Sequence, residues 1–444
     1  MAVNHPVVIV GGGAAGLSAA RTLHKQGIPF RLFEASPQLG GRLATRVVDG
    51  FRIDRGFQVL LTAYPEVANW ITDPTLALKP YCSGMAILGQ AGNDTPTAHY
   101  LADPRRHPSD ALASALAPYG TPWDRVRLVR LIVDRFIESD PLESFFPDSP
   151  LLQLSTLAWL QQLGFSLGFI HHVLRPFLAG ILLDPDLATS AAMAAFVLRM
   201  MAAGQTTTPA LGMGELARVL AAPLPAKALH CQSPVVAAEQ DAVTLADGTR
   251  VDAAAVIVAT PWAKARQLMV HDIPRPKTAR DLACTTLAIG LPSPSADVKN
   301  TPLSRALQSP WLMLNGMGSG HLVSNHAVML SAASPALAPA GQALLSVTVL
   351  DPHAQSLDDE ALFLAIQKEW RPWLFTQADH WRLLVVDRIP QALSWLAPGT
   401  VPEMITAHNG VVFCGDWLAY PSLNGALASG RMAAEAVVGA LSLR

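Results

Sequence analysis

The chain has 444 residues, of which 50% are hydrophobic and 15% are charged, and its formal net charge is −2. This composition excludes a disordered chain and predicts a globular protein with a large buried fraction. Because 444 residues exceed the size at which one hydrophobic core stops growing, we expect two domains. No block of like charge stands out, so we expect no nucleic-acid partner.

The cysteines and the apolar stretches exclude further classes. The four cysteines lie far apart, without a CxxC pair or a metal-ligand spacing, so we expect neither a disulfide framework nor a metal site. The most apolar stretch, 177–203, is interrupted by charges and a proline, whereas a membrane-spanning helix needs about 20 apolar residues. We therefore expect no transmembrane segment, while peripheral membrane contact and the oligomeric state stay open. No signal peptide is expected, and the predicted compartment is the reducing cytoplasm.

The first functional pattern begins at residue 6. An apolar strand, 6–10, leads into the motif Gly11-x-Gly13-x-x-Gly16, and a helical pattern follows. A second strand, 30–33, ends at Glu34, which lies roughly 20 residues beyond the glycines, as expected of a carboxylate that hydrogen-bonds an adenosine ribose. Strand, glycine motif, helix, strand and acid together predict a dinucleotide-binding unit.

Each glycine of the motif has a physical reason. Gly11 makes the tight turn, Gly13 lets the backbone approach a pyrophosphate, and Gly16 lets the helix pack closely on the strand. The first turn of the helix, at Ala14 and Ala15, offers free N–H groups and the positive end of the helix dipole to the phosphates.

The next motifs indicate which dinucleotide is bound. Gly40-Gly41-Arg42 follows Glu34, and Asp54-Arg-Gly-Phe-Gln58 comes shortly after. These stretches resemble the Gly-Gly-Arg and Asp-x-Gly motifs of the superfamily of flavin amine oxidases, phytoene desaturases and protoporphyrinogen oxidases. The resemblance implies that Arg42 and the adjacent backbone hold the diphosphate of FAD, and that Gly56 passes close to the isoalloxazine ring.

The middle of the chain extends this resemblance. Residues 208–215 are similar to the Pro-x-Gly-Gly-Met loop of the superfamily, and they precede a predicted helix. Strands are predicted at 233–237, 242–248 and 255–261, with an Asp-Gly turn after the second. The resemblance implies that the backbone of the first of these strands contacts the adenine at Val235 or Val236.

The C-terminal motif completes the resemblance. A strand, 410–414, runs into Gly415-Asp416, and a helix begins near Gly425-Ala426. In the superfamily the acid reaches the ribityl–phosphate chain of FAD, and the N-terminus of the last helix points at the pyrimidine edge of the ring. A positive dipole end at this edge stabilises reduced flavin.

Together these motifs predict an α/β protein that has a Rossmann-type FAD-binding domain and a discontinuous α+β substrate domain. The FAD-binding domain is expected to comprise 1–60, 205–275 and 395–444, and the substrate domain 61–204 and 276–394, with helices over 122–136, 154–163, 167–178 and 190–203. The residues expected to contact FAD are Gly11, Gly13, Ala14, Ala15, Gly16, Glu34, Ala35, Gly41, Arg42, Gly56, Phe57, Gln58, Val235, Pro261, Gly415, Asp416, Ser422, Leu423, Asn424 and Ala426.

Three functions are compatible with these motifs. The first is dehydrogenation or desaturation of a largely apolar small molecule by hydride transfer to flavin N5. The second is oxidation of an amine. The third is non-enzymatic binding of a lipidated partner on the same fold, which would not require the intact Gly-Asp and Asn-Gly-Ala motifs at the C-terminus.

Two positions favour the first function over the second. Amine oxidases typically carry a tyrosine just before the Gly-Ala helix, where Ser422 stands here, and usually a lysine on a strand of the substrate domain, which 285–290 lacks. Trp417 and Tyr420 could instead supply aromatic walls for an amine, or they could be core residues. A flavin accepts hydride without a protein acid or base, and no catalytic residue is predicted.

Overall fold

The computed structural model describes residues 5–68, 72–91, 95–137, 140–269, 280–293, 302–317, 323–374 and 379–443. The predicted domain boundary at 275–276 lies outside these residues.

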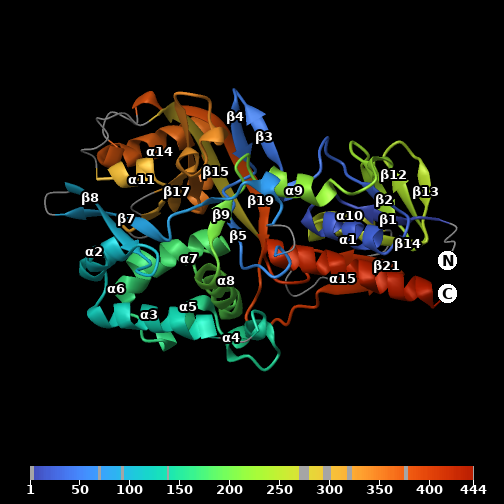
Figure 1. The fold of residues 1–444 in the computed structure, drawn as a ribbon, viewed down its shortest axis with the longest axis horizontal. Helices are drawn as coiled ribbons and strands as arrows, with labels where there is room; N and C mark the ends of the chain where they lie inside the picture. Colours follow the sequence, from blue (N-terminus) through green and yellow to red (C-terminus); the bar gives the residue numbers. More distant parts are fainter. Residues whose placement is uncertain are drawn as a thin grey trace.

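A six-stranded sheet forms one end of the molecule, beside both termini (Figure 1). Its strands, in spatial order, are β10 (Leu229–His230), β2 (Phe30–Phe33), β1 (Val7–Val10), β14 (Ala255–Val258), β21 (Val411–Cys414) and β20 (Ile405–His408). All neighbouring strands are parallel except β20, which is antiparallel to β21. Three distant parts of the sequence therefore meet in one sheet, and the predicted Rossmann-type fold is confirmed.

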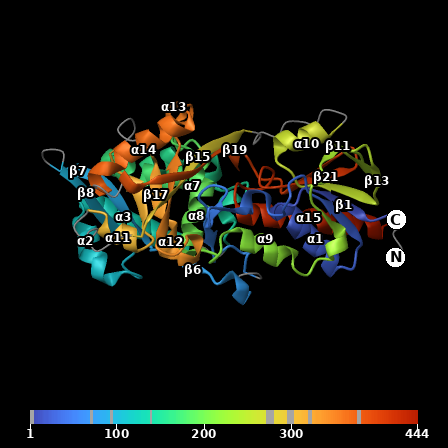
Figure 2. The same cartoon turned by 90° about the horizontal axis from the view of Figure 1, so that it is seen from above.

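Strand β1 is buried on both sides, as a central strand of a parallel sheet must be. Val7 and Ile9 share a core with α1 (Ala14–Lys25) and α15 (Leu423–Ser442). Val8 and Val10 belong to the core on the opposite face, which α10 (Trp262–Leu268) and a small antiparallel sheet cover (Figure 2). The strands of that small sheet are β11 (Val235–Ala238), β12 (Ala242–Leu245) and β13 (Arg250–Asp252).

The other half of the molecule contains a seven-stranded mixed sheet. Its strands, in spatial order, are β19 (Arg382–Ser394), β15 (Asp281–Pro292), β18 (Gln342–Val349), β17 (His326–Met329), β16 (Leu312–Asn315), β7 (Gly84–Ala91) and β8 (Thr95–Ala102). Strands β7 and β16 pair in parallel and join a segment from the first half of the chain to one from the second. Because these two segments pair, the second α+β layer is formed by discontinuous parts of the sequence.

Helices gather beside this sheet, at the end of the molecule far from the termini (Figure 1). They are α2 (Ala111–Leu116), α3 (Pro122–Ile137), α4 (Pro150–Gln153), α5 (Thr156–Gln162), α6 (Leu167–Phe169), α7 (Arg175–Leu182) and α8 (Ala191–Ala203). All four helices predicted in this region are present. Ser155 and Ser190 are N-caps that precede α5 and α8, because each hydroxyl accepts a backbone N–H of the first turn. A π-helical turn, Ile170–Leu174, joins α6 to α7.

A hairpin of β3 (Thr45–Val48) and β4 (Phe51–Asp54) is tied to α9 (Gly214–Ala221) by one carboxylate. Asp54 Oδ1 accepts the Thr45 hydroxyl and the Met213 N–H at 2.9 Å, while Thr45 Oγ1 accepts the N–H of Gly214 at 2.8 Å. Burial raises the pKa of Asp54 to about 6, against the opposing effect of these hydrogen bonds.

Asp54→Asn should make the protein more stable than the wild type above pH 6. Because the pKa is raised in the folded state, the wild type loses stability as pH rises from about 4 to 6, and the loss is complete above pH 6. Asparagine keeps the accepting oxygen without the charge. Between about pH 4 and pH 6, the melting temperature of the variant should rise relative to that of the wild type by roughly 2–4 °C. Asp241→Asn, at an exposed position, is the control, and an equal pH profile for the Asp54→Asn variant and the wild type would contradict the assignment.

Candidate FAD site

The glycine loop after β1 leaves an open space at the N-terminus of α1. Gly11 has a φ of +105°, and a Cβ there would lie 2.8 Å from the carbonyl oxygen of Ala259, so only glycine fits. Gly13 is the N-cap of α1 and lacks a side-chain cap, and a Cβ built on it would meet no atom within 4 Å. The N-terminus of α1 therefore borders open space at Gly13, where the N–H groups of its first turn could bind a pyrophosphate.

Glu34 borders this loop at the end of β2. Its Oε2 accepts the N–H of Gly12 at 2.7 Å, and its Oε1 accepts the N–H of Ser36 at 2.8 Å. The backbone of Glu34 also bonds to His230 and Ser233, which brings the chain entering β11 and Val235 to the same end of the sheet. Ala35 follows directly. The carboxylate predicted to bind the ribose is thus fixed next to the phosphate loop.

The Gly40-Gly41 turn packs on the glycine loop. Gly40 and Gly41 have φ values of +118° and +56°, and the Gly40 N–H donates to the carbonyl of Gly12 at 2.8 Å. A Cβ on Gly41 would lie 3.3 Å from the Cα of Gly13. The two predicted phosphate-binding stretches therefore lie side by side, and the turn directs Arg42 toward the C-terminal motif.

A bidentate ion pair joins the N-terminal and C-terminal motifs. Arg42 donates from Nη1 to Asp416 Oδ2 at 2.9 Å and from Nη2 to Asp416 Oδ1 at 2.5 Å, and Nη1 also reaches the carbonyl oxygen of Ala392 at 3.1 Å. The Asp416 carboxylate raises the pKa of Arg42. Residues 374 positions apart thus form one ion pair, next in sequence to Gly41, which packs on Gly13.

A second carboxylate that the sequence did not indicate lies nearby. Burial and the charge of Asp416 raise the pKa of Asp281, the first residue of β15, while Arg42 opposes this effect. No local pattern around Asp281 marks it, because its proximity to Arg42 arises only when β15 enters the second sheet.

The Asp-x-Gly stretch lies against that sheet. Gly56 has a φ of +82°, and a Cβ there would lie 2.9 Å from Ile389 Cδ1, on β19. Phe57 packs edge-on against His326 and Tyr81, with centroid separations of 5.5 Å and 6.0 Å. The Gln58 amide donates to the carbonyl oxygens of Arg42, at 2.5 Å, and Arg55, at 3.0 Å. Gln58 therefore supports the backbone that carries Arg42.

The C-terminal motif is positioned by hydrogen bonds from within α15. The Gly415 N–H donates to the hydroxyl of Ser429 at 2.8 Å, a contact that the sequence did not predict. Ser422 is the N-cap of α15, where its hydroxyl accepts the N–H of Gly425 at 2.9 Å. Leu423 and Ala426 lie in the first turn of this helix.

Two predicted residues occupy different settings. The Asn424 side chain is buried and used within the protein, because its amide donates to the Tyr420 hydroxyl at 2.6 Å and its oxygen accepts the N–H of Glu66 at 2.9 Å. Pro261 is the N-cap of α10. It stands two residues after Ala259, whose carbonyl oxygen lies next to Gly11. Contacts printed for Gly11, Glu34, Gly41 and Arg42 thus connect the N-terminal motifs with one another and with Asp416, and the contacts of all the predicted residues with FAD remain a prediction.

Within the described ranges, no group of three or more His, Cys, Asp and Glu side chains could hold a metal ion. A search of the same residues finds no helix with the length and apolar character needed to cross a membrane.

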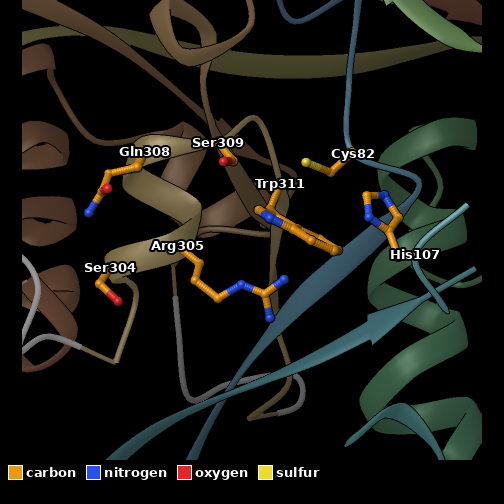
Figure 3. A pocket seen from close by; sticks show the side chains of 7 residues that line it. All are labelled: Cys82, His107, Ser304, Arg305, Gln308, Ser309 and Trp311. Atoms are coloured by element: carbon orange, nitrogen blue, oxygen red, sulfur yellow. The ribbon is translucent and has the colours of Figure 1, made fainter. Parts of the chain in front are cut away.

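A surface pocket of about 440 Å³ lies away from this site, between α11 (Ser304–Gln308) and the chain near Cys82 (Figure 3). Its guanidinium, from Arg305, is paired with Asp110 at 2.9 Å and lies over the ring of Trp311. Burial raises the pKa of the Cys82 thiol to about 11, so the thiol is protonated at neutral pH. The pocket thus presents neither an unpaired cation nor a reactive thiolate.

The parallel sheet and the glycine loop define a dinucleotide-binding fold. The sequence pattern of the family described as flavin containing amine oxidoreductase matches residues 14–438. The chain belongs to this family, and it is an FAD-dependent oxidoreductase. The residues present fit FAD, since the open space at Gly13 leaves room for a pyrophosphate and Arg42 directly follows Gly41, which packs on Gly13.

Comparisons with individual proteins show the fold over the whole chain and sequence identity over short parts. The structure of cyclohexylamine oxidase from Brevibacterium oxydans superposes with a TM-score of 0.70 and 18% identity, covering 99% of both chains. A carotenoid 3,4-desaturase from Haloarcula japonica is 52% identical over 11% of this chain and 10% of its own. A putrescine oxidase from Kocuria rosea is 44% identical over 18% of this chain and 16% of its own. These matches span less than a fifth of either relative.

Gly13→Val should abolish FAD binding and leave the fold intact. The valine side chain would project into open space, where it clashes with a pyrophosphate but not with the protein. Flavin absorbance after purification and circular dichroism measure the two effects. Gly439→Val is the matched control, because a Cβ there is equally unobstructed but lies near the end of α15. A Gly13→Val protein that retains FAD would contradict the position of the diphosphate.

Asp416→Ala should weaken FAD binding by about 1–3 kcal/mol without unfolding the protein, because it removes a buried acceptor and releases Arg42 from its bidentate pair. Asp416→Asn, which keeps one accepting oxygen, should lose less. Titration of the apoprotein with FAD gives the affinities. Unchanged affinity in the alanine variant would refute a role for Asp416 at the cofactor.

Proposed function

We propose that this enzyme dehydrogenates or desaturates a largely apolar small molecule. Bound FAD supplies the hydride acceptor. The chain itself binds the donor, orients it and excludes water. The observation that carries this proposal is the role of Ser422, which stands where amine oxidases typically place a cage tyrosine.

Ser422 is committed to the helix. Its hydroxyl caps α15 by accepting the N–H of Gly425, so this position presents neither an aromatic ring nor a free hydroxyl to a substrate. The nearby aromatic residues do not replace the tyrosine. Tyr420 is 2% exposed and stacks on Phe145 at a centroid separation of 4.7 Å, and Trp417 is also 2% exposed, with its Nε1 donating to the carbonyl of Thr260 at 3.0 Å. Both are core residues.

The strand beside the Asp-x-Gly stretch offers no amine-oxidase lysine. β15 passes next to Gly56, since a Cβ on Gly56 would lie 4.0 Å from Thr286 Oγ1. From Asp281 to Pro292 this strand contains no lysine. The residues facing Gly56 are Thr286 and Ile389, which suit an uncharged donor.

The aromatic cluster of Phe57, Tyr81 and His326 is also uncharged at neutral pH. His326 is fully buried, and burial lowers its pKa to about 4. Burial raises the pKa of Tyr81 above its ordinary value. Neither group carries charge that would attract an ammonium ion, and an uncharged surrounding of this kind favours apolar ligands at about 25 cal/mol per Å² buried.

Amine oxidation is the second candidate. The putrescine oxidase and the carotenoid 3,4-desaturase are each similar to a short part of this chain, and the cyclohexylamine oxidase shares its fold. Shared ancestry therefore does not choose between the reactions, and the residues at 422 and along β15 favour the apolar donor.

We propose the cytoplasm as the compartment. All four cysteines are free thiols, and Cys284 and Cys414 are buried, as is common in proteins of reducing compartments.

Anaerobic stopped-flow mixing with two panels of donors tests the proposal. Putrescine, cyclohexylamine and other simple amines should leave the oxidised flavin spectrum unchanged, because Ser422 replaces the cage tyrosine and β15 carries no lysine. Apolar polyenes or porphyrinogen-like donors should bleach it with saturable rates. Rapid, saturable bleaching by a simple amine would overturn the proposal and establish the amine oxidase reading.

A further inference from the structure

A second carboxylate acts on the arginine of the candidate FAD site. Asp281, the first residue of β15, pairs across the sheet with Ser394 on β19. Arg42 contacts the same end of β19, where its Nη1 donates to the carbonyl oxygen of Ala392 at 3.1 Å. Asp416 and, more weakly, Asp281 raise the pKa of Arg42. Three charged side chains from distant parts of the sequence therefore meet beside one end of β19.

These three groups carry more negative than positive charge when both carboxylates are ionised. Asp416 already holds Arg42 in a bidentate pair, with Nη–Oδ distances of 2.9 Å and 2.5 Å. Because arginine stays protonated in proteins, the ionised Asp281 carboxylate gives the group an excess of negative charge. The resemblance at Gly40-Gly41-Arg42 implies that this arginine holds the diphosphate of FAD. The excess charge therefore opposes the ligand that Arg42 is expected to hold.

Of the two carboxylates, Asp281 is the better placed to take up a proton. Both oxygens of Asp416 accept hydrogen bonds from Arg42. The half-buried Asp281 carboxylate accepts no hydrogen bond from any described residue. Burial and the charge of Asp416 raise the pKa of Asp281, while Arg42 opposes this effect. Protonation of Asp281 therefore breaks no hydrogen bond within the described part of the chain and removes the excess charge.

The other neighbours of Asp281 leave this charge balance as it is. Arg280, the preceding residue, lies over the ring of Trp395, with its guanidinium carbon 5.2 Å from the ring centroid. The residue that faces Asp281 on β19 is an uncharged serine. Among the described residues, the charged groups that act on Asp281 are Arg42, from the turn Gly41–Leu43, and Asp416, from the loop after β21.

We propose that Asp281 acts on FAD through Arg42 as a positioning residue, and that FAD binding transfers a proton from solvent to the Asp281 carboxylate. The diphosphate brings further negative charge to Arg42, which disfavours the ionised form of a carboxylate that already interacts with Asp416. Protonation of Asp281 leaves Arg42 shared between Asp416 and the cofactor.

The direction of the pH dependence follows from linkage. If the FAD complex binds more protons than the free protein, the affinity for FAD rises as pH falls through the range in which Asp281 titrates. Because burial and Asp416 raise the pKa of Asp281, this range lies above the ordinary range of an aspartate. The inference concerns the cofactor and is independent of the donor that the enzyme oxidises.

Calorimetric titration of the apoprotein with FAD tests the inference, in two buffers of different ionisation enthalpy so that the protons taken up are counted. From about pH 8 to about pH 5 the wild type should bind FAD more tightly as pH falls, with net uptake of protons. D281N removes the charge and nearly keeps the size of the side chain. It should bind FAD about tenfold more tightly than the wild type at about pH 8, because the repulsion is gone, and take up fewer protons.

Two further variants separate the charge of Asp281 from a merely structural role. D281E keeps the carboxylate, so it should retain the pH dependence of the wild type. D134N is the matched control, because it also removes one carboxylate, which is 46% exposed on α3 at the end of the molecule far from the nucleotide sheet (Figure 1). It should bind FAD like the wild type.

Each other outcome counts against the inference. A wild type that binds FAD with the same affinity across this pH interval, without proton uptake, overturns it whether or not the variants fold. Equal affinity of D281N and the wild type at the upper end of the interval overturns it as well. So does a D281E variant that loses the pH dependence, or a D134N variant that changes as D281N does. Circular dichroism confirms that each variant is folded before it is titrated.

Discussion

The close contact between the first helix and the last one is the constraint on which the FAD site depends. A Cβ on Gly430 of α15 would collide with the carbonyl oxygen of Ala15 in α1, so the two backbones touch where Gly430 stands. This approach seats α15 on the same face of the sheet as α1. It brings the motif that begins at Gly415 to the cavity beside Gly13, although about 400 residues separate the two in the chain. Hydrogen bonds reinforce the seating, since Ser18 on α1 donates to the carbonyl of Leu427 at 2.7 Å.

The ion pair of Arg42 and Asp416 is a consequence of that seating. Asp416 is 5% exposed and Arg42, whose side chain is 35% exposed, reaches it from the Gly40-Gly41 turn, so solvent screens the carboxylate little and the guanidinium more. A buried carboxylate without a partner would be costly, and the bidentate geometry satisfies both of its oxygens. The pair lies at the edge of the open cradle, where a diphosphate would add negative charge near the guanidinium. The nearby Asp281 carboxylate makes the local charge balance depend on all three groups.

The substrate half of the molecule uses polar residues for architecture and presents apolar ones elsewhere. Asp124, Ser155 and Ser190 each accept backbone N–H groups at or near the start of a helix. These polar side chains are therefore occupied in holding the fold, while the aromatic cluster next to Gly56 is uncharged and packed.

The sequence by itself determined the nucleotide fold, because a glycine motif, its flanking strands and the acid at Glu34 depend on local backbone geometry and short spacing. It also predicted the substrate-side helices, whose apolar periodicity is local. The N-caps Ser155 and Ser190 lie within a residue of the start of the predicted helices, and the π-helical turn lies inside one of them. Tertiary structure alone decided which residues meet across long separations: Asp281 with Arg42, Ser429 with Gly415, and the parallel pairing of β7 with β16. It also decided the direction in which α3 faces, because an apolar stripe has the same periodicity whether it packs inward or outward. Here Asp124 and Arg125 are held by hydrogen bonds with Ser166 and Ala117, while Trp123 and Val126 are exposed, and these contacts exist only in the folded chain.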